Sequence, residues 1–251
     1  MDPGSPDVTW PLVGRATELQ GVSTLLRSGR GAVVLAGAAG VGKTRLATEF
    51  LEVAATQGFV PIRVAATQGA AGLPFGAFAS LVPDLTLSTD LLGVLRKIAH
   101  AVAGRGRGKP VAVLVDDADL LDHSSAALTH LLATTQQTFV LATLRSGEQA
   151  PGAVVALWKD GLAERIELRP FAGHEIEAFL AAALRGPVDG ATVHLLQRRT
   201  EGNVLFLREA RPRRPGDGLA APRGRNLAAD RPASSVVSSC GDHRDSPGRT
   251  R

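Results

Sequence analysis

Residues 31–44 read GAVVLAGAAGVGKT, and this stretch decides the fold. Its first half is a short apolar run bounded by glycines, which is typical of a strand buried on both faces of a parallel sheet. Its second half, GAAGVGKT at 37–44, fits the pattern G-x-x-x-x-G-K-[ST] of a phosphate-binding loop. From Lys43 to Gln57 the apolar residues recur at helical spacing. The stretch therefore predicts a strand, a phosphate-binding loop and a helix in direct succession.

The chemistry of the loop follows from its residue types. Its glycines let the backbone wrap closely around phosphates, so that N–H groups and the helix N-terminus face the anionic oxygens. We expect Lys43 to reach the β- and γ-phosphates, and the Thr44 hydroxyl to coordinate Mg²⁺. The alternative is a glycine-rich turn that matches the pattern by chance. The predicted nucleotide contacts are Gly37, Ala38, Ala39, Gly40, Val41, Gly42, Lys43 and Thr44.

A second apolar strand ends in acids. Residues 111–117 read VAVLVDD, the expected Walker B strand, whose last residues reach the carboxyl edge of the sheet beside the loop. Asp116 is the candidate on the Mg²⁺ side. Asp117 should point to the other side of the strand end and polarise an attacking water, or else be a solvated loop carboxylate. For Asp119 and Asp122 we favour a structural role, since capping of a helix that starts near Ser124 explains at least one of them.

Arg145 follows another apolar strand, FVLAT at 139–143. At the same sheet edge its guanidinium could contact the γ-phosphate and stabilise charge there. A surface arginine is the alternative, and position alone leaves the two interpretations even.

The remaining pattern predicts an α/β fold. Strands are expected at 31–36, 59–65, 111–117, 139–143 and 164–168, with helices between them, which makes a doubly wound parallel sheet. The expected helices begin behind Thr17 as N-cap, at Lys43, at residues 73 and 90, and at Ser124, which is expected to cap a helix through Leu132. Past Pro170 the pattern turns helical, with Ile176, Phe179 and Leu180 on one helix and Val193, Leu195 and Leu196 on the next.

These patterns divide the chain into four parts. We expect a disordered N-terminus at 1–10, a P-loop NTPase domain at 11–170, the start of a small helical subdomain at 171–210 and a disordered tail at 211–251. The tail is dense in Arg, Pro and Gly and has no periodicity.

Charge, cysteine content and hydropathy argue against a specific DNA-binding protein, a protein with an internal disulfide, and a secreted or membrane protein. Residues 211–251 hold nine Arg and four Asp, a balance of +5 against +4 for the whole chain, which leaves −1 for residues 1–210. The part predicted to fold is not basic, so we expect no specific DNA binding by this chain. The single cysteine, Cys240, forms no internal disulfide. No secretory signal or membrane span is visible, and we expect a cytoplasmic protein.

Seven segments taken together resemble one family, the STAND-type, AAA-like ATPase module of large LuxR-family transcriptional regulators of actinobacterial type. The resemblance covers nearly all of residues 11–210. The segments are PLVGR at 11–15, GAAGVGKTRL at 37–46, LPFGAF at 73–78, VLVDDADLLD at 113–122, LATLRSG at 141–147, ELRPF at 167–171 and TEGNVLFLREA at 200–210.

The resemblance implies a nucleotide switch, in which ADP holds a closed state and exchange for ATP opens the protein for assembly and DNA binding. It also implies residue roles. Gly14 and Arg15 match a motif near the base and ribose, and Arg145 matches the sensor-1 arginine. Gly202 and Asn203 match a helical-domain motif that closes over the adenine.

The sequence departs from the family in two ways. Val204 stands where the family usually has Pro, which puts the adenine-side contact in doubt. Family members also continue for several hundred residues to a C-terminal helix-turn-helix, and no such segment follows Ala210 here. The abrupt change of composition is what an out-of-frame reading of GC-rich DNA would give, so a frameshifted or truncated gene product is expected.

The sequence therefore predicts an ATP/ADP- and Mg²⁺-binding switch domain of a LuxR-type regulator, with slow hydrolysis and nucleotide-dependent self-association as further expectations. The alternatives are an autonomous AAA-type ATPase and a non-functional fragment. No substrate-gripping pore loop is identifiable for a ring motor, and no Arg-rich lid for a small-molecule kinase.

Overall fold

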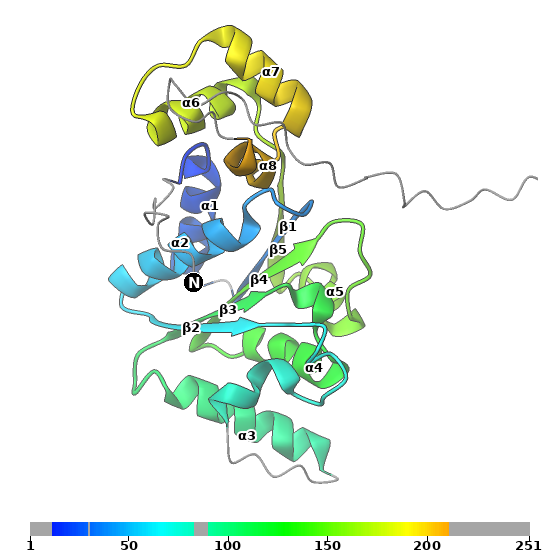
Figure 1. The fold of residues 1–251 in the computed structure, drawn as a ribbon. Helices are drawn as coiled ribbons and strands as arrows, with labels where there is room; N and C mark the ends of the chain where they lie inside the picture. The colour runs from blue at the N-terminus through cyan, green and yellow to red at the C-terminus, as the bar shows by residue number, and fades with distance from the viewer. Residues whose placement is uncertain (1–11, 30, 83–89, 211–251) are drawn as a thin grey trace, which may run out of the picture. The chain divides into compact units, whose positions relative to one another are not determined.

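A five-stranded parallel sheet forms the centre of the computed structural model, which describes residues 12–29, 31–82 and 90–210 (Figure 1). The strand order is β2-β3-β4-β1-β5, and every neighbouring pair is parallel. The predicted α/β P-loop NTPase fold is confirmed. The predictions for residues 1–11 and 211–251 lie outside the described residues. The strands are β1 (Ala32–Gly37), β2 (Val60–Ala65), β3 (Val111–Asp116), β4 (Thr138–Arg145) and β5 (Ala163–Leu168).

The strand order places the phosphate-binding loop where open α/β sheets bind ligands. After β1 the chain crosses to β2 at one edge of the sheet, returns through β3 and β4, and adds β5 on the other side of β1. Ligands in open α/β sheets bind outside the carboxyl ends of the strands where the order reverses. The loop that leaves β1 lies at that point.

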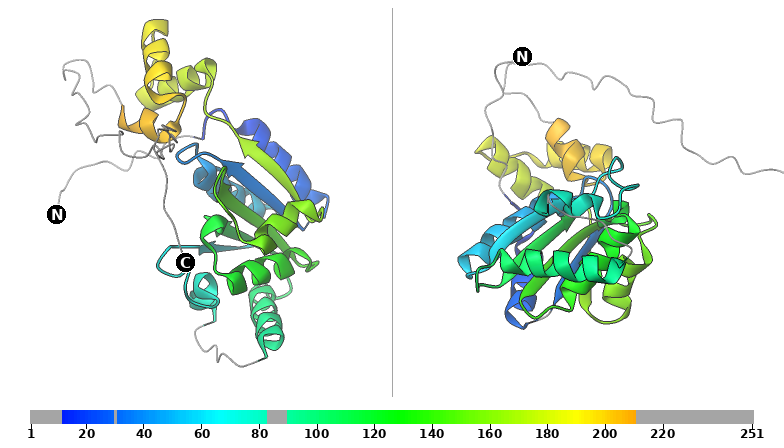
Figure 2. Two further views of the ribbon diagram at one scale, coloured as in Figure 1. Left: turned by 90° about the vertical axis from the view of Figure 1, so that its right-hand side faces the viewer. Right: turned by 90° about the horizontal axis from the view of Figure 1, so that it is seen from below.

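Helices cover both faces of the sheet, so it is doubly wound (Figures 1 and 2). On one face α1 (Ala16–Arg27) and α2 (Lys43–Thr56) pack against alternate residues of the strands, such as Val33 and Leu141. On the other face lie α3 (Leu91–Gly104), α4 (His123–Ala133) and α5 (Gly152–Lys159). All six residues of β1 and of β3 are buried, as expected for strands covered on both sides.

Two predicted helix caps are wrong. Helix α1 begins at Ala16 with Arg15 as its N-cap residue, not behind Thr17, because the Arg15 carbonyl already accepts a helical hydrogen bond from the N–H of Leu19. Helix α4 begins at His123 and is capped by Asp122 rather than by Ser124. The Asp122 Oδ1 atom accepts hydrogen bonds from the backbone N–H groups of Ser124 and Ser125 at 2.9 Å each, and from that of Phe75 at 3.1 Å. The structural role favoured for Asp122 is thus observed.

Two further elements differ from the sequence pattern. The helix expected over 73–82 is a 3₁₀-helix, η1 (Gly76–Leu81), and a second 3₁₀-helix, η2 (Ala118–Leu120), follows β3. Helix α5 was not predicted, because GAVVALWK is short, begins with glycine and is apolar at nearly every position, which hides a helical period.

Three helices after β5 share a core of their own. They are α6 (Gly173–Leu184), α7 (Gly190–Thr200) and α8 (Val204–Glu209). Phe171, Ile176, Phe179, Leu180, Val193, Leu196 and Leu207 form this core. Leu195 was expected on the buried face of its helix but is 50% exposed, since the face of α7 that packs on α6 carries Val193 and Leu196. In the described part of the chain, no helix is long and apolar enough to cross a membrane.

Candidate functional site

The loop at 37–44 joins the buried end of β1 to the first turn of α2, as the motif predicts. Gly42 is the N-cap residue of α2 and has φ of +98°, a conformation that only glycine adopts readily. Gly40 has φ of +79°, and a Cβ atom there would lie 2.4 Å from Oδ1 of Asn203. The backbone conformation therefore requires glycine at both positions. At Gly40 the nearby Asn203 side chain also leaves no room for a Cβ atom.

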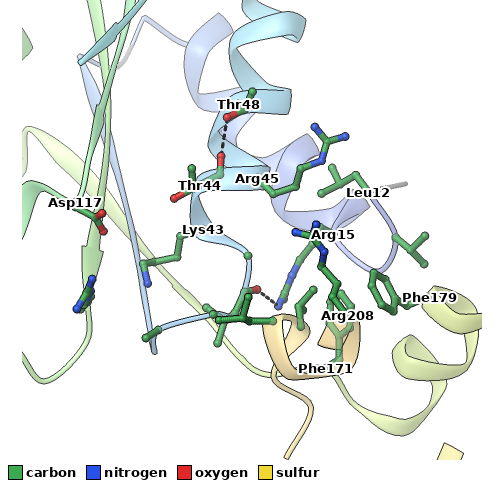
Figure 3. A pocket seen from close by; sticks show the side chains of 18 residues that line it. Leu12, Arg15, Lys43, Thr44, Arg45, Thr48, Asp117, Phe171, Phe179 and Arg208 are labelled. Atoms are coloured by element: carbon green, nitrogen blue, oxygen red, sulfur yellow. Dashed lines mark hydrogen bonds between the residues drawn. The ribbon is translucent and has the colours of Figure 1, made fainter. Parts of the chain in front are cut away.

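Lys43 is almost fully buried and points along the loop (Figure 3). Its Nζ atom donates hydrogen bonds to the carbonyl oxygens of Gly37 and Ala38, each at 2.9 Å. Burial lowers the pKa of this ammonium, and the nearby Arg145 lowers it further, while Asp117 and Asp119 oppose the shift. Phosphate oxygens would replace two neutral carbonyls with charged acceptors, which form stronger hydrogen bonds.

Asp116 connects the end of β3 to the loop. Its Oδ1 atom accepts hydrogen bonds from the hydroxyls of Thr44, at 2.9 Å, and Thr143, at 2.8 Å. Its Oδ2 atom pairs with Nη2 of Arg63 at 2.9 Å. The structure therefore brings together the two residues expected on the Mg²⁺ side, Thr44 and Asp116.

The donor set fits Mg²⁺ better than a softer metal. A hydroxyl and a carboxylate supply hard oxygen atoms, and Mg²⁺ uses few protein ligands because it keeps water and takes phosphate oxygens. Within the described residues, no group of three or more His, Cys, Asp or Glu side chains could hold a metal ion. With one hydroxyl and one carboxylate as protein ligands, the site suits a cation that takes its other ligands from water and a nucleotide.

Asp117 lies on the wall of the same pocket, facing Lys43 (Figure 3). We expected it on the other side of the strand end from Asp116. The strand, expected to run through Asp117, stops at Asp116; Asp117 has φ of +53°, and its N–H donates a 2.9 Å hydrogen bond to the Thr143 hydroxyl. Burial, followed by the charges of Asp116 and Asp119, raises the pKa of the Asp117 carboxyl.

Arg145 is the last residue of β4 and lines the pocket with an exposed side chain. It pairs in register with Gly37, the first residue of the loop, and its backbone N–H donates to Oδ1 of Asp119 at 3.1 Å. This position puts a positive charge at the end of the pocket where Lys43 and Asp117 lie.

Arg15 lines the pocket, but most of the hydrogen-bonding groups of its guanidinium are occupied by partners within the protein. Its guanidinium donates to the carbonyl oxygens of Arg169 at 2.6 Å and Val41 at 3.3 Å, and pairs with Glu18 at 2.9 Å. It also lies over the ring of Phe171, 4.8 Å from the centroid. Arg15 therefore fastens the loop to the chain after β5.

Of the other two residues expected at the base, Gly14 does not line the pocket and packs against Glu175. Asn203 acts on the loop rather than on the pocket. Its Nδ2 atom donates to the Ala39 carbonyl at 2.8 Å, and its Oδ1 atom accepts from the backbone N–H of Leu205, at the start of α8. The same N–H also donates to the Gly40 carbonyl at 3.1 Å.

The pocket has a volume of about 470 Å³, within the range of small-molecule sites. The loop, Asp117 and Arg145 form one end. Side chains that were not among the predicted nucleotide contacts form the other end: Leu12, Val13, Phe171, Phe179, Val204, Leu205 and Arg208. They come from both ends of the described chain, so no local pattern could identify them, although Val204 to Arg208 lie in the GNVLFLRE segment.

Comparisons with solved structures show a common fold. The Orc1 protein of Aeropyrum pernix, solved in complex with DNA, matches with a TM-score of 0.58 and 19% identity, over 82% of this chain and 60% of that one. The Walker-type ATPase PABY2304 of Pyrococcus abyssi matches with a TM-score of 0.53 and 17% identity, over 82% and 68%. Cdc6p of Pyrobaculum aerophilum matches with a TM-score of 0.52 and 16% identity, over 75% and 54%. This chain thus spans less than two thirds of the Orc1 and Cdc6p chains.

Sequence comparison is more specific about the family. No curated protein matches the chain. The family model of the AAA ATPase domain matches residues 11–145, a stretch that includes the loop, Asp116, Asp117 and Arg145. That match covers more than half of the 251 residues, and the chain belongs to the AAA ATPase domain family.

Proposed function

We propose that the chain binds ATP or ADP with Mg²⁺ in this pocket and acts as the nucleotide switch of a LuxR-type transcriptional regulator. The phosphates lie against residues 37–44, with Lys43 turned from the loop carbonyls to the β- and γ-phosphates. The base and ribose occupy the apolar end, near Phe171 and Val204. The pocket volume of about 470 Å³ supports this arrangement.

Two oxygen ligands hold the cation in this proposal. Thr44 contacts Mg²⁺ through its hydroxyl, and Asp116 binds it directly or through water. When bound, Mg²⁺ neutralises part of the phosphate charge. The hydrogen bonds from Thr44 and Thr143 to Asp116 support this role, because they hold the carboxylate beside the loop.

Hydrolysis requires a base near the γ-phosphate, and Asp117 is our candidate. It accepts a proton from the attacking water as the new O–P bond forms and the bond to the β,γ-bridging oxygen breaks. A carboxyl whose pKa is raised is a better proton acceptor than an ordinary one, which supports the assignment. Arg145 stabilises the γ-phosphate charge.

One observation carries the switch proposal: α8 is hydrogen-bonded to the loop. The Asn203 amide holds the Ala39 carbonyl, and the Leu205 N–H holds the Gly40 carbonyl. A change in the loop when the γ-phosphate binds or leaves would alter both contacts. We infer that α8 transmits the nucleotide state to α6 and α7, the other two helices after β5, with which it shares a core.

An autonomous AAA ATPase is the second candidate, because Asp117 and Arg145 line the same pocket as the loop. Steady-state turnover distinguishes the two candidates. A switch hydrolyses ATP slowly and retains ADP, whereas an autonomous ATPase turns over continuously at saturating ATP.

Hydrogen exchange at the amides of residues 204–209 tests the switch directly. We expect stronger protection with ADP than with a non-hydrolysable ATP analogue, each at saturating concentration with Mg²⁺. Asn203→Ala should reduce this difference, since one of the two links to the loop is gone. His194→Ala, at an exposed position of α7, is the matched control and should retain it. Equal protection in both nucleotide states of the parent protein would refute the switch and leave nucleotide binding standing.

A further inference from the structure

Arg63 forms an ion pair with Asp116 that no nucleotide-binding motif requires. Its Nη2 atom lies 2.9 Å from Oδ2 of Asp116. The two partners differ in exposure, with 50% of the Arg63 side chain exposed and only 7% of the Asp116 side chain. A buried carboxylate is therefore neutralised by an arginine that can withdraw into solvent.

The alternation of the edge strand β2 explains how this pair forms. Ile62 and Val64 face the core under α3, so Arg63 projects to the opposite face, where α2 packs. Asp116 lies on that same face of β3, because Ala112 and Leu114 pack there. Ala65 is the register partner of Asp116, so the long Arg63 side chain reaches the carboxylate from two residues earlier.

The bonds at Asp116 are divided unequally between its two oxygens. Oδ1 accepts the hydroxyls of Thr44 and Thr143, which are part of the loop–strand connection. Oδ2 is held by Arg63. A cation, or a water of its hydration shell, can gain Oδ2 only if Arg63 leaves or shares that atom.

We propose that Arg63 competes with Mg²⁺ for Asp116, and so sets the Mg²⁺ concentration at which the site retains nucleotide. This inference rests on the proposed function. Without the cation, Arg63 compensates the buried charge of Asp116. When Mg²⁺ enters with the nucleotide, the guanidinium is displaced at modest cost, because half of its side chain is already hydrated.

The test is a Mg²⁺ titration of the binding of a fluorescent ADP analogue to the full chain. Arg63→Gln should lower the half-saturating Mg²⁺ concentration by roughly fivefold, the upper end of what exposed ion pairs contribute. Arg63→Lys retains the charge and should stay close to the parent.

Two controls separate competition from a general loss of positive charge. Arg165→Gln removes an arginine from β5, the opposite edge strand, where it pairs with Glu167, and should leave the titration unchanged. In an Asp116→Asn background, Arg63→Gln should have no further effect, because the group for which the two cations compete is absent.

An unchanged half-saturating Mg²⁺ concentration in Arg63→Gln, with nucleotide binding intact, would overturn the inference alone. A higher concentration would overturn it too, since Arg63 would then be holding Asp116 in place for the metal. A parent protein that binds no nucleotide at any Mg²⁺ concentration would refute the proposed function and this inference together.

Discussion

Replacing Asp117 by asparagine should stabilise the nucleotide-free protein while stopping ATP hydrolysis. Burial and the charges of Asp116 and Asp119 raise the pKa of this carboxyl above its ordinary value of 3.8, and Arg145 and Lys43 offset only part of the shift. A raised pKa means that the folded protein holds the ionised form at a cost. Asparagine removes the charge and tolerates the left-handed backbone at this position, where φ is +53°.

The pH dependence of this effect follows from the direction of the shift. Above the folded-state pKa of Asp117 the carboxyl is ionised in both states, so the whole cost is present. Below 3.8 it is protonated in both states, and the cost disappears. The stability advantage of Asp117→Asn should therefore develop as the pH rises through the window that begins at 3.8. Because the group is partly exposed, we expect a gain below about 1 kcal/mol.

Thermal unfolding without nucleotide, in the presence of EDTA, measures this gain. A chain of this size should show a rise in Tm of about 1–3 °C near pH 8 and almost none near pH 3, below the window. Glu52→Gln, which removes an exposed charge from α2, is the matched control and should change neither value. A less stable Asp117→Asn protein near pH 8, or an equal gain at both pH values, would refute the reasoning. The variant should still bind ATP, and turnover equal to that of the parent would place the base elsewhere.

Two further substitutions test other parts of the site. Arg145→Ala should weaken ATP by about tenfold and ADP much less, since a charged hydrogen bond to the γ-phosphate is lost; equal losses in equilibrium binding would make Arg145 a surface arginine. Asp122→Ala should lower the free energy of unfolding by about 2 kcal/mol in urea denaturation, because three backbone N–H groups, including that of Phe75, lose their acceptor. Asp122→Asn, which keeps an acceptor oxygen, should lose much less, and an equal loss would contradict this explanation.

The sequence predicted those parts of the site that local constraints determine. A strand buried on both faces, a loop that requires glycine at 40 and 42 and a helix beginning at Lys43 follow each other within 25 residues, so their pattern is visible directly. The end of β3 was also predictable, because an apolar run that stops at acids marks the edge of a parallel sheet. The contact between Thr44 and Asp116 follows from these two facts.

The remaining parts of the site depend on contacts between segments that lie far apart in the sequence. Arg63 carries no motif, and its pairing with Asp116 needs the position of β2 beside β3, which the sequence did not specify. Asn203 was expected at the adenine, yet it binds the loop, 164 residues away along the chain. Arg15 was assigned to the base and ribose, but its inward turn depends on the carbonyl of Arg169.

The backbone at Asp117 was not predictable from the strand pattern. The strand was expected to run through Asp117, but it ends at Asp116, and Asp117 takes a left-handed conformation. Non-glycine residues with positive φ are uncommon, and Asp is among those that tolerate it, so composition alone gives little warning of such a turn.

Equilibrium calorimetry of ATP and ADP with Mg²⁺, on the full chain, tests the central claim most directly. We predict one nucleotide per chain, and a loss of at least about tenfold in affinity in Lys43→Ala, because the ammonium that holds the Gly37 and Ala38 carbonyls is the charge that the phosphates would meet. His194→Ala, far from the loop in sequence and exposed on α7, should bind like the parent. No heat of binding in the parent, or equal affinity in Lys43→Ala, would contradict the assignment of this pocket to a nucleotide.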